Sequence, residues 1–189
     1  MRNGAFVAVP ARTSIDQSSD LNCVMHLEKD GLESEALRQF SEALCSELKE
    51  PRFHFKELRQ PPEPDAYCEF DGQPLYLEVG HVYGTTADIK QLLGRTGQSA
   101  PSQEDKLASA MIPLDLRILA PLNRLLAKKA TKKYRATRIW LLIRSAFPLW
   151  DLRDFQEHQS RILIPSRHPF EQIWLLCGVK APSGILRLA

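Results

Sequence analysis

Two carboxylates, Asp65 and Glu78, flank a short segment whose middle is the turn pair Asp71-Gly72. Such a pair is typical of a tight hairpin, so the pattern predicts two antiparallel strands that bring both carboxylates to the same place. Carboxylate oxygens are the ligands that hard divalent cations such as Mg²⁺ prefer. A cation held there would polarise a phosphate and lower the pKa of a bound water. The main-chain carbonyl of Val79 is a further candidate ligand.

The elements around this hairpin are predicted from hydrophobic periodicity. Apolar residues recur every three to four positions over 32–49 and 113–130, which predicts two amphipathic helices. A shorter helix is predicted over 152–162. The predicted strands cover residues 53–58, 67–70, 74–82, 139–143 and 173–179. The order α-β-β-β-α-β-α-β predicts a mixed α/β architecture.

The chain length of 189 residues favours one domain, because domains usually run to ~100–200 residues. Residues 1–30 are polar without periodicity, and we expect them to be weakly ordered. Residues 31–189 are predicted to form the single domain. A polar, glycine-interrupted stretch near 84–110 is predicted to be a long loop, and such loops are usually functional or mobile.

Composition excludes several classes of protein. Hydrophobic residues make up 43% and charged residues 25% of the chain, which argues against disorder, collagen and coiled coils. No apolar run reaches the ~18–20 residues that span a bilayer. The four cysteines and five histidines lack the spacing of zinc sites. We therefore expect reduced thiols, a cytoplasmic location and no membrane partner.

The residues of the hairpin resemble the motif of the PD-(D/E)xK superfamily, the restriction-endonuclease-like nucleases. Pro64-Asp65 matches the PD half, and Glu78-Val79-Gly80 occupies the (D/E)xK half after the apolar strand Leu75-Tyr76-Leu77. The resemblance covers roughly residues 31–179. It implies a restriction-endonuclease-like αβββαβ core, in which helices flank a mixed central sheet, and it identifies residues 31–189 as the nuclease-like domain of a divergent member.

The resemblance also implies an activity, the metal-dependent hydrolysis of phosphodiester bonds by an endonuclease or exonuclease. Asp65, Glu78 and the Val79 carbonyl would hold Mg²⁺, with Mn²⁺ as an alternative. An acidic residue often lies in the first helix of the superfamily. Glu33 shares a face with the apolar residues of that helix and is the candidate for a further metal contact, with Glu47 as second choice.

Gly80 departs from the family pattern, because the motif has a lysine there. In some superfamily members this lysine lies on the following helix. Lys129 and Lys133 continue the apolar stripe of the second main helix, so they are the candidates for the catalytic lysine. The same departure supports a second hypothesis, a catalytically inactive nuclease fold that acts as a nucleic-acid-binding or protein-interaction module.

Charge is unevenly distributed along the chain. Residues 28–78 hold 13 acidic and 6 basic residues, whereas residues 85–145 hold 12 basic and 4 acidic ones. Carboxylates beside a basic strip suit a phosphodiester substrate, so we predict a nucleic-acid partner, DNA in preference to RNA. A homodimer is a further expectation, because many nucleases cut two strands as two-fold dimers. The residues expected to contact nucleic acid are Arg124, Lys128, Lys132, Lys133 and Arg135.

Each of these signals also has an ordinary structural interpretation. Asp65 after a proline is common in turns. The alternation around Glu78 is also typical of a strand carboxylate that faces solvent. Lysines at a helix end are stabilised by the helix dipole. These alternatives leave a third hypothesis, a protein unrelated to nucleases whose hairpin only mimics the motif.

Overall fold

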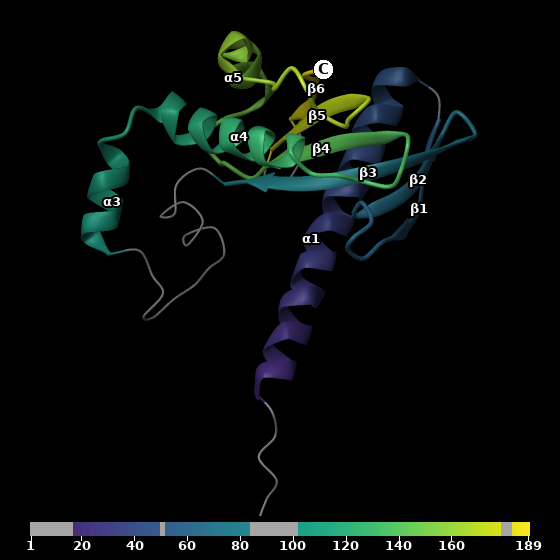
Figure 1. Cartoon of the computed structure of the whole chain (residues 1–189). Helices are drawn as coiled ribbons and strands as arrows, with labels where there is room; N and C mark the ends of the chain where they lie inside the picture. The colour runs from purple at the N-terminus through teal and green to yellow at the C-terminus, as the bar shows by residue number, and fades with distance from the viewer. Residues whose placement is uncertain (1–16, 50–51, 84–101, 179–182) are drawn as a thin grey trace, which may run out of the picture.

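The computed structural model of the chain describes residues 17–49, 52–83, 102–178 and 183–189. It shows an α/β fold in which helices flank a six-stranded mixed sheet (Figure 1). The strands lie in the sheet in chain order: β1 (Phe53–Leu58), β2 (Ala66–Phe70), β3 (Gln73–Val82), β4 (Ile139–Ser145), β5 (Gln172–Cys177) and β6 (Gly184–Arg187). The helices are α1 (Gln17–Leu48), α3 (Gln103–Ala110), α4 (Leu114–Ala130), α5 (Leu152–Glu157) and the 3₁₀ turn η2 (Gln159–Arg161).

The predicted hairpin is present, and its turn has the expected chemistry. Asp71 and Gly72 have φ of 54° and 71°, the positive values that a two-residue primed turn requires. The antiparallel pairing of β2 with β3 runs from Phe70 opposite Gln73 to Ala66 opposite Leu77. β3 then continues beyond the start of β2 as far as Val82. This overhang is where the candidate site lies.

β3 is a central strand, and β4 pairs beside it in parallel. Every residue of β4 is buried, because helices cover both faces of the sheet. β5 pairs in parallel with β4. The short strand β6 pairs antiparallel with β5 and was not predicted, since its four residues are too few to show alternation.

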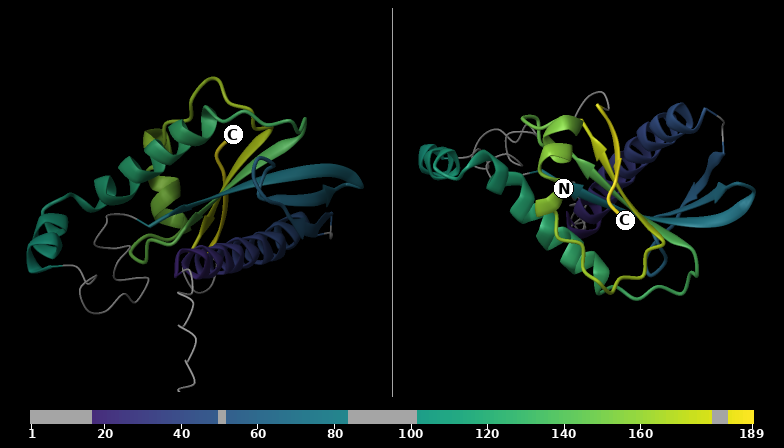
Figure 2. Two further views of the ribbon diagram at one scale, coloured as in Figure 1. Left: turned by 60° about the horizontal axis from the view of Figure 1, so that its bottom comes forward. Right: turned by 90° about the horizontal axis from the view of Figure 1, so that it is seen from above.

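Two apolar cores lie on opposite faces of the sheet (Figure 2). Helix α1 packs against the face that carries Leu75, Leu77 and Val79, whereas α4 packs against the face that carries Val82. Successive side chains of a strand point to opposite faces. Glu78, like Val82, therefore faces α4. Residues Ala36, Leu37, Phe40 and Leu44 form the buried stripe of α1, and Ile118, Leu119, Leu122 and Leu126 form that of α4.

Helix α1 begins at Gln17, so it includes residues 17–30, ahead of the predicted helix start. The prediction placed the helix start after Gly31, but one interior glycine costs only about 1 kcal/mol relative to alanine, and residues 17–30 contain no proline or further glycine. Residues 1–16 lie outside the described ranges. The loop predicted near 84–110 contains helix α3, and its residues 84–101 lie outside the described ranges.

Two expectations drawn from composition concern thiols and membrane spans. Cys45, Cys68 and Cys177 are free thiols, as predicted. Among the helices that the structure describes, none has the length and hydropathy needed to cross a membrane.

We expect the buried β4 strand to dominate stability. Leu142 is fully buried, so Leu142→Ala should lower the free energy of unfolding by about 2–5 kcal/mol through lost burial and the cavity that remains. Leu163 is 65% exposed, and the matched change Leu163→Ala should alter it by less than about 0.5 kcal/mol. Urea denaturation of both variants tests this. Equal losses would show that β4 does not lie in the core.

Candidate active site

The site lies where β2 stops pairing with β3 and the main chain of Val79 needs other partners. Asp65, directly before β2, accepts a hydrogen bond from the Val79 N–H through Oδ2 at 2.8 Å. The main chain of Asp65 is itself fixed, since its carbonyl accepts from the Arg59 N–H at 2.9 Å. Asp65 is only 7% exposed. The carboxylate is therefore held against the middle of β3 by the connector that precedes β2.

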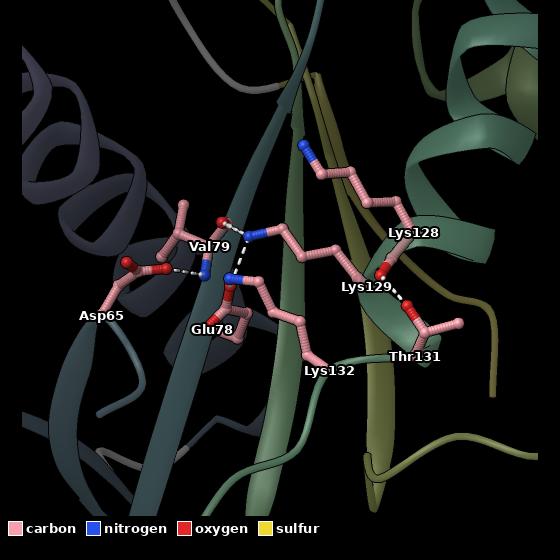
Figure 3. A network of polar contacts seen from close by, with 7 residues as sticks. All are labelled: Asp65, Glu78, Val79, Lys128, Lys129, Thr131 and Lys132. Carbon is pink, nitrogen blue, oxygen red and sulfur yellow. Dashed lines mark hydrogen bonds and ion pairs between the residues drawn. The ribbon is translucent and has the colours of Figure 1, made fainter. Parts of the chain in front are cut away.

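Lys129 provides the second contact to this peptide. Its Nζ donates to the Val79 carbonyl at 2.6 Å and to Oε1 of Glu78 at 2.5 Å (Figure 3). Lys132 donates to the same Glu78 oxygen at 2.7 Å. The Glu78 side chain is 2% exposed, so its charge is removed from water and needs these partners. Burial alone would raise the pKa of Glu78, but the two ammonium groups outweigh it and lower that pKa below its ordinary value.

Helix periodicity explains why Lys129 reaches β3. Leu122, Leu125 and Leu126 lie three to seven positions earlier on α4, so Lys129 extends the face that packs on the sheet. A Cβ at Gly80 would lie 3.1 Å from Cδ2 of Leu125 and 3.5 Å from Cε of Lys129. The glycine thus leaves room for the stem of the lysine. A larger side chain at position 80 would compete with Lys129 for the same space.

The end of α4 turns Lys132 toward Glu78. The Thr131 hydroxyl donates to the Lys128 carbonyl at 2.9 Å, and the Lys132 N–H donates to the Lys129 carbonyl at 3.2 Å. The chain leaves the helix there, and Lys132 reaches back to Glu78. Lys128, by contrast, is exposed, and Figure 3 shows its ammonium apart from the Glu78 contacts.

Asp65, Glu78, Val79, Lys129 and Lys132 line a pocket of about 420 Å³ that is built from four parts of the chain. Glu33 of α1 joins it and is 4% exposed, so the structure brings the first-helix carboxylate to the predicted place. The wall consists of Glu33, residues 61–63, Asp65, Glu78, Val79, Lys129 and residues 132–134.

The other predicted basic residues lie around this pocket rather than in one strip. Lys133 lines it from the segment after α4. Arg135 lines a neighbouring pocket. Arg124 and Lys128 are exposed on α4, outside the wall of either pocket. Lys132, also predicted to contact nucleic acid, donates to Glu78.

Tyr134 is a site residue that the sequence did not indicate. Its hydroxyl is buried in the pocket wall, where it interacts with the carboxylate of Glu78. Burial raises the pKa of Tyr134, and the nearby carboxylates of Glu78 and Asp65 raise it further, so the phenol stays protonated. A lone tyrosine after a lysine cluster carries no signal of such a role.

The donor set suits a hard cation. Two carboxylates and a main-chain carbonyl offer oxygen ligands, and Mg²⁺ usually takes few protein ligands and keeps several waters. The Glu78 and Val79 oxygens already converge on one ammonium nitrogen, so their geometry favours a positive charge between them. In the described ranges, no group of three or more His, Cys, Asp or Glu side chains is placed to hold a metal, so Glu33 does not complete a three-carboxylate cluster.

Comparisons with known proteins do not assign the chain to a family. No family model, no curated protein and no solved structure matches it. We therefore infer function from the geometry of the site.

We predict that Lys129 stabilises the fold through the Val79 and Glu78 contacts. Lys129→Met keeps the apolar stem over Gly80 but leaves the Val79 carbonyl without this donor and Glu78 with Lys132 alone. The free energy of unfolding should fall by about 1–3 kcal/mol, the usual cost of an unsatisfied buried polar group. The control Lys128→Met should change it by less than about 0.5 kcal/mol. Urea denaturation in EDTA measures the free energy of unfolding of both variants. Equal losses in the two variants would contradict a stabilising role of the buried Lys129 contacts.

Proposed function

We propose that this protein is a metal-dependent nuclease of the restriction-endonuclease-like type. One observation carries the proposal: the Lys129 ammonium donates hydrogen bonds to both the Glu78 carboxylate and the Val79 carbonyl. The family motif brings a lysine to its acidic residue from two positions along the same strand. Here the motif has Gly80, and the lysine reaches the acidic residue from α4 through the space that the glycine leaves.

The order of elements supports the same proposal. α1, β1, β2, β3, α4 and β4 follow one another as an αβββαβ unit, with helices on both sides of the sheet. Within it, β1, β2 and β3 are antiparallel neighbours, and the crossover through α4 makes β4 parallel to β3. With α3 placed between β3 and α4, this order agrees with the αβββαβ order that the resemblance implies, and it supports the proposal.

In this proposal Asp65, Glu78 and the Val79 carbonyl hold the cation, Mg²⁺ or alternatively Mn²⁺. A bound cation would supply Lewis-acid stabilisation of the phosphate and of the attacking water. The hydrogen bond from the Val79 N–H fixes the Asp65 carboxylate beside this peptide. Glu33, which lines the same pocket, would order water or a second ion.

The donors of the pocket act on the substrate. Lys129 places a positive charge beside Glu78, where negative charge develops on the phosphate during attack. The Tyr134 hydroxyl lines the same pocket beside Glu78 and remains protonated, so it is placed to donate to a phosphate oxygen. Lys132 and Lys133 neutralise the substrate backbone at the rim. Arg124 and Lys128 on α4 and Arg135 beside the second pocket extend this positive surface for nucleic acid, DNA in preference to RNA.

One observation favours the inactive module as a second candidate. Lys129 and Lys132 both donate to the same oxygen of Glu78, which is the oxygen that a cation would need. If these ion pairs persist, the cluster is a structural element, and the positive surface alone binds nucleic acid. Metal binding therefore separates the two candidates.

We expect Mg²⁺-dependent cleavage of DNA that requires both hairpin carboxylates. Asp65→Asn and Glu78→Gln should each abolish cleavage and weaken Mg²⁺ binding measured by calorimetry, because each removes one anionic ligand. Glu69→Gln, on the same hairpin but outside the pocket, is the control and should leave both unchanged. Cleavage by a folded Asp65→Asn, Glu78→Gln double variant would remove the site assignment. Wild-type protein that binds DNA without Mg²⁺ binding or cleavage would establish the inactive module.

Lys129 and the exposed Lys128 should affect different steps. Lys129→Ala should slow cleavage ~100-fold or more while DNA affinity changes little, as for loss of transition-state charge stabilisation. Lys128→Ala should leave the cleavage rate at saturating substrate unchanged. It should reduce the slope of log affinity against log salt concentration by roughly 0.7–0.9, as for one lost phosphate contact. Single-turnover cleavage and salt titrations measure the two quantities, and parallel losses in both variants would contradict the catalytic role.

A further inference from the structure

A second pocket of about 400 Å³ lies next to the candidate active site. The two pockets share a wall made by Pro62 and Glu63. Tyr76 and Arg135 line the second pocket together with further residues of the connector before β2. Its volume is in the range of small-molecule sites, about 300–1,000 Å³. Any polymer that places a phosphate in the first pocket has its neighbouring groups within reach of the second.

The Tyr76 ring in this wall packs against the neighbouring strand β2. Tyr76 lies directly opposite Tyr67 on β2, with ring centroids 5.4 Å apart. The Arg59 guanidinium covers the Tyr67 ring at 5.5 Å and is itself paired with Glu63 at 3.0 Å. Tyr76 is thus a preorganised flat surface at the edge of a pocket, and aromatic rings of this kind bind nucleobases by stacking.

The register of β3 fixes the distance between this ring and the candidate active site. Tyr76 and Glu78 are two residues apart on one strand, so they point to the same face at roughly 7 Å. The separation of Tyr76 from Glu78 is similar to the distance between the phosphate and the base of one nucleotide. Arg135, in the same wall, provides a cation for the backbone or for the base plane.

We infer that the second pocket binds the unpaired base of the nucleotide whose phosphate lies in the candidate active site, and that the substrate class is therefore a single-stranded polynucleotide. The inference rests on the proposed function for the position of the phosphate. In a duplex both faces of a base are covered by its neighbours, and the base reaches Tyr76 only after it leaves the stack. A single strand exposes its bases without that cost.

Fluorescence of 2-aminopurine, which is quenched when the base stacks, tests this directly. Single-stranded oligonucleotides that carry one 2-aminopurine, moved stepwise along the strand, are titrated with the full chain in EDTA so that no cleavage occurs. Addition of the chain should strongly quench the single-stranded oligonucleotide whose base analogue lies on Tyr76. Addition of the chain should cause no further quenching when the same oligonucleotides are in duplex form.

Three variants assign the effect to the ring. Tyr76→Leu should abolish quenching and weaken single-strand binding about 5- to 100-fold, the range for loss of one base stack, whereas Tyr76→Phe should retain both. Phe55→Leu removes an aromatic ring from β1 that is 44% exposed and outside the pocket, and it should change neither. An abasic position in the oligonucleotide should weaken binding to the wild-type chain by a similar factor, which tests the stack without any change to the fold.

The outcomes distinguish the inference from the proposed function. Quenching that depends on Tyr76, without cleavage by Mg²⁺ or Mn²⁺, would support the base site and overturn the nuclease. Metal-dependent cleavage that is unaffected by Tyr76→Leu and by abasic positions would support the nuclease and overturn the base site. Equal affinity for duplex and single strand, unchanged by Tyr76→Leu, would also overturn the base site. The absence of both binding and cleavage would overturn both.

Discussion

The main-chain groups of Val79 constrain the candidate active site. β3 continues past the first residue of β2, so Val79 has no register partner on β2, although Leu142 of β4 lies opposite it on the other side. A buried peptide group that lacks a partner is costly, and two side chains provide the partners instead: Asp65 accepts from the N–H and Lys129 donates to the carbonyl. This requirement places a carboxylate and an ammonium at one point of the sheet. Glu78, buried beside them, adds the second carboxylate.

The same contacts carry both stability and the proposed chemistry. A buried carboxylate is tolerated only with charged partners, and Lys129 and Lys132 both serve Glu78. The proposed nuclease uses the same oxygens for a cation and the same ammonium for the phosphate. The stem of Lys129 lies over Gly80, in space that a side chain at that position would enter. The lysine cluster at the end of α4 is thus divided by position, with Lys129 and Lys132 turned to Glu78 and Lys128 turned to solvent.

Much of the fold follows from short-range patterns. The hairpin turn at Asp71 and Gly72, the apolar stripe of α4 and the buried run of β4 are local signals, and each element appears where its pattern predicts. The differences arise where local signals are weak. The pattern placed the helix start after Gly31, but α1 runs through this residue from Gln17, since one interior glycine costs only about 1 kcal/mol. β6 is too short to show a period and exists because β5 offers it an edge.

The sequence by itself indicated the two hairpin carboxylates, and the family resemblance added Glu33 and the lysines of the second main helix as candidates. These follow because hairpin register and helix periodicity are local and decide which residues share a face. Only the tertiary structure decided that Lys129 reaches the Glu78 and Val79 oxygens, that Lys132 joins it, and that Tyr134 lines the pocket. It also decided that Tyr76 and Arg135 share a second pocket. Such contacts depend on how α4 and the segment after it cross β3, and that crossing is set by the packing of side chains far apart in the chain.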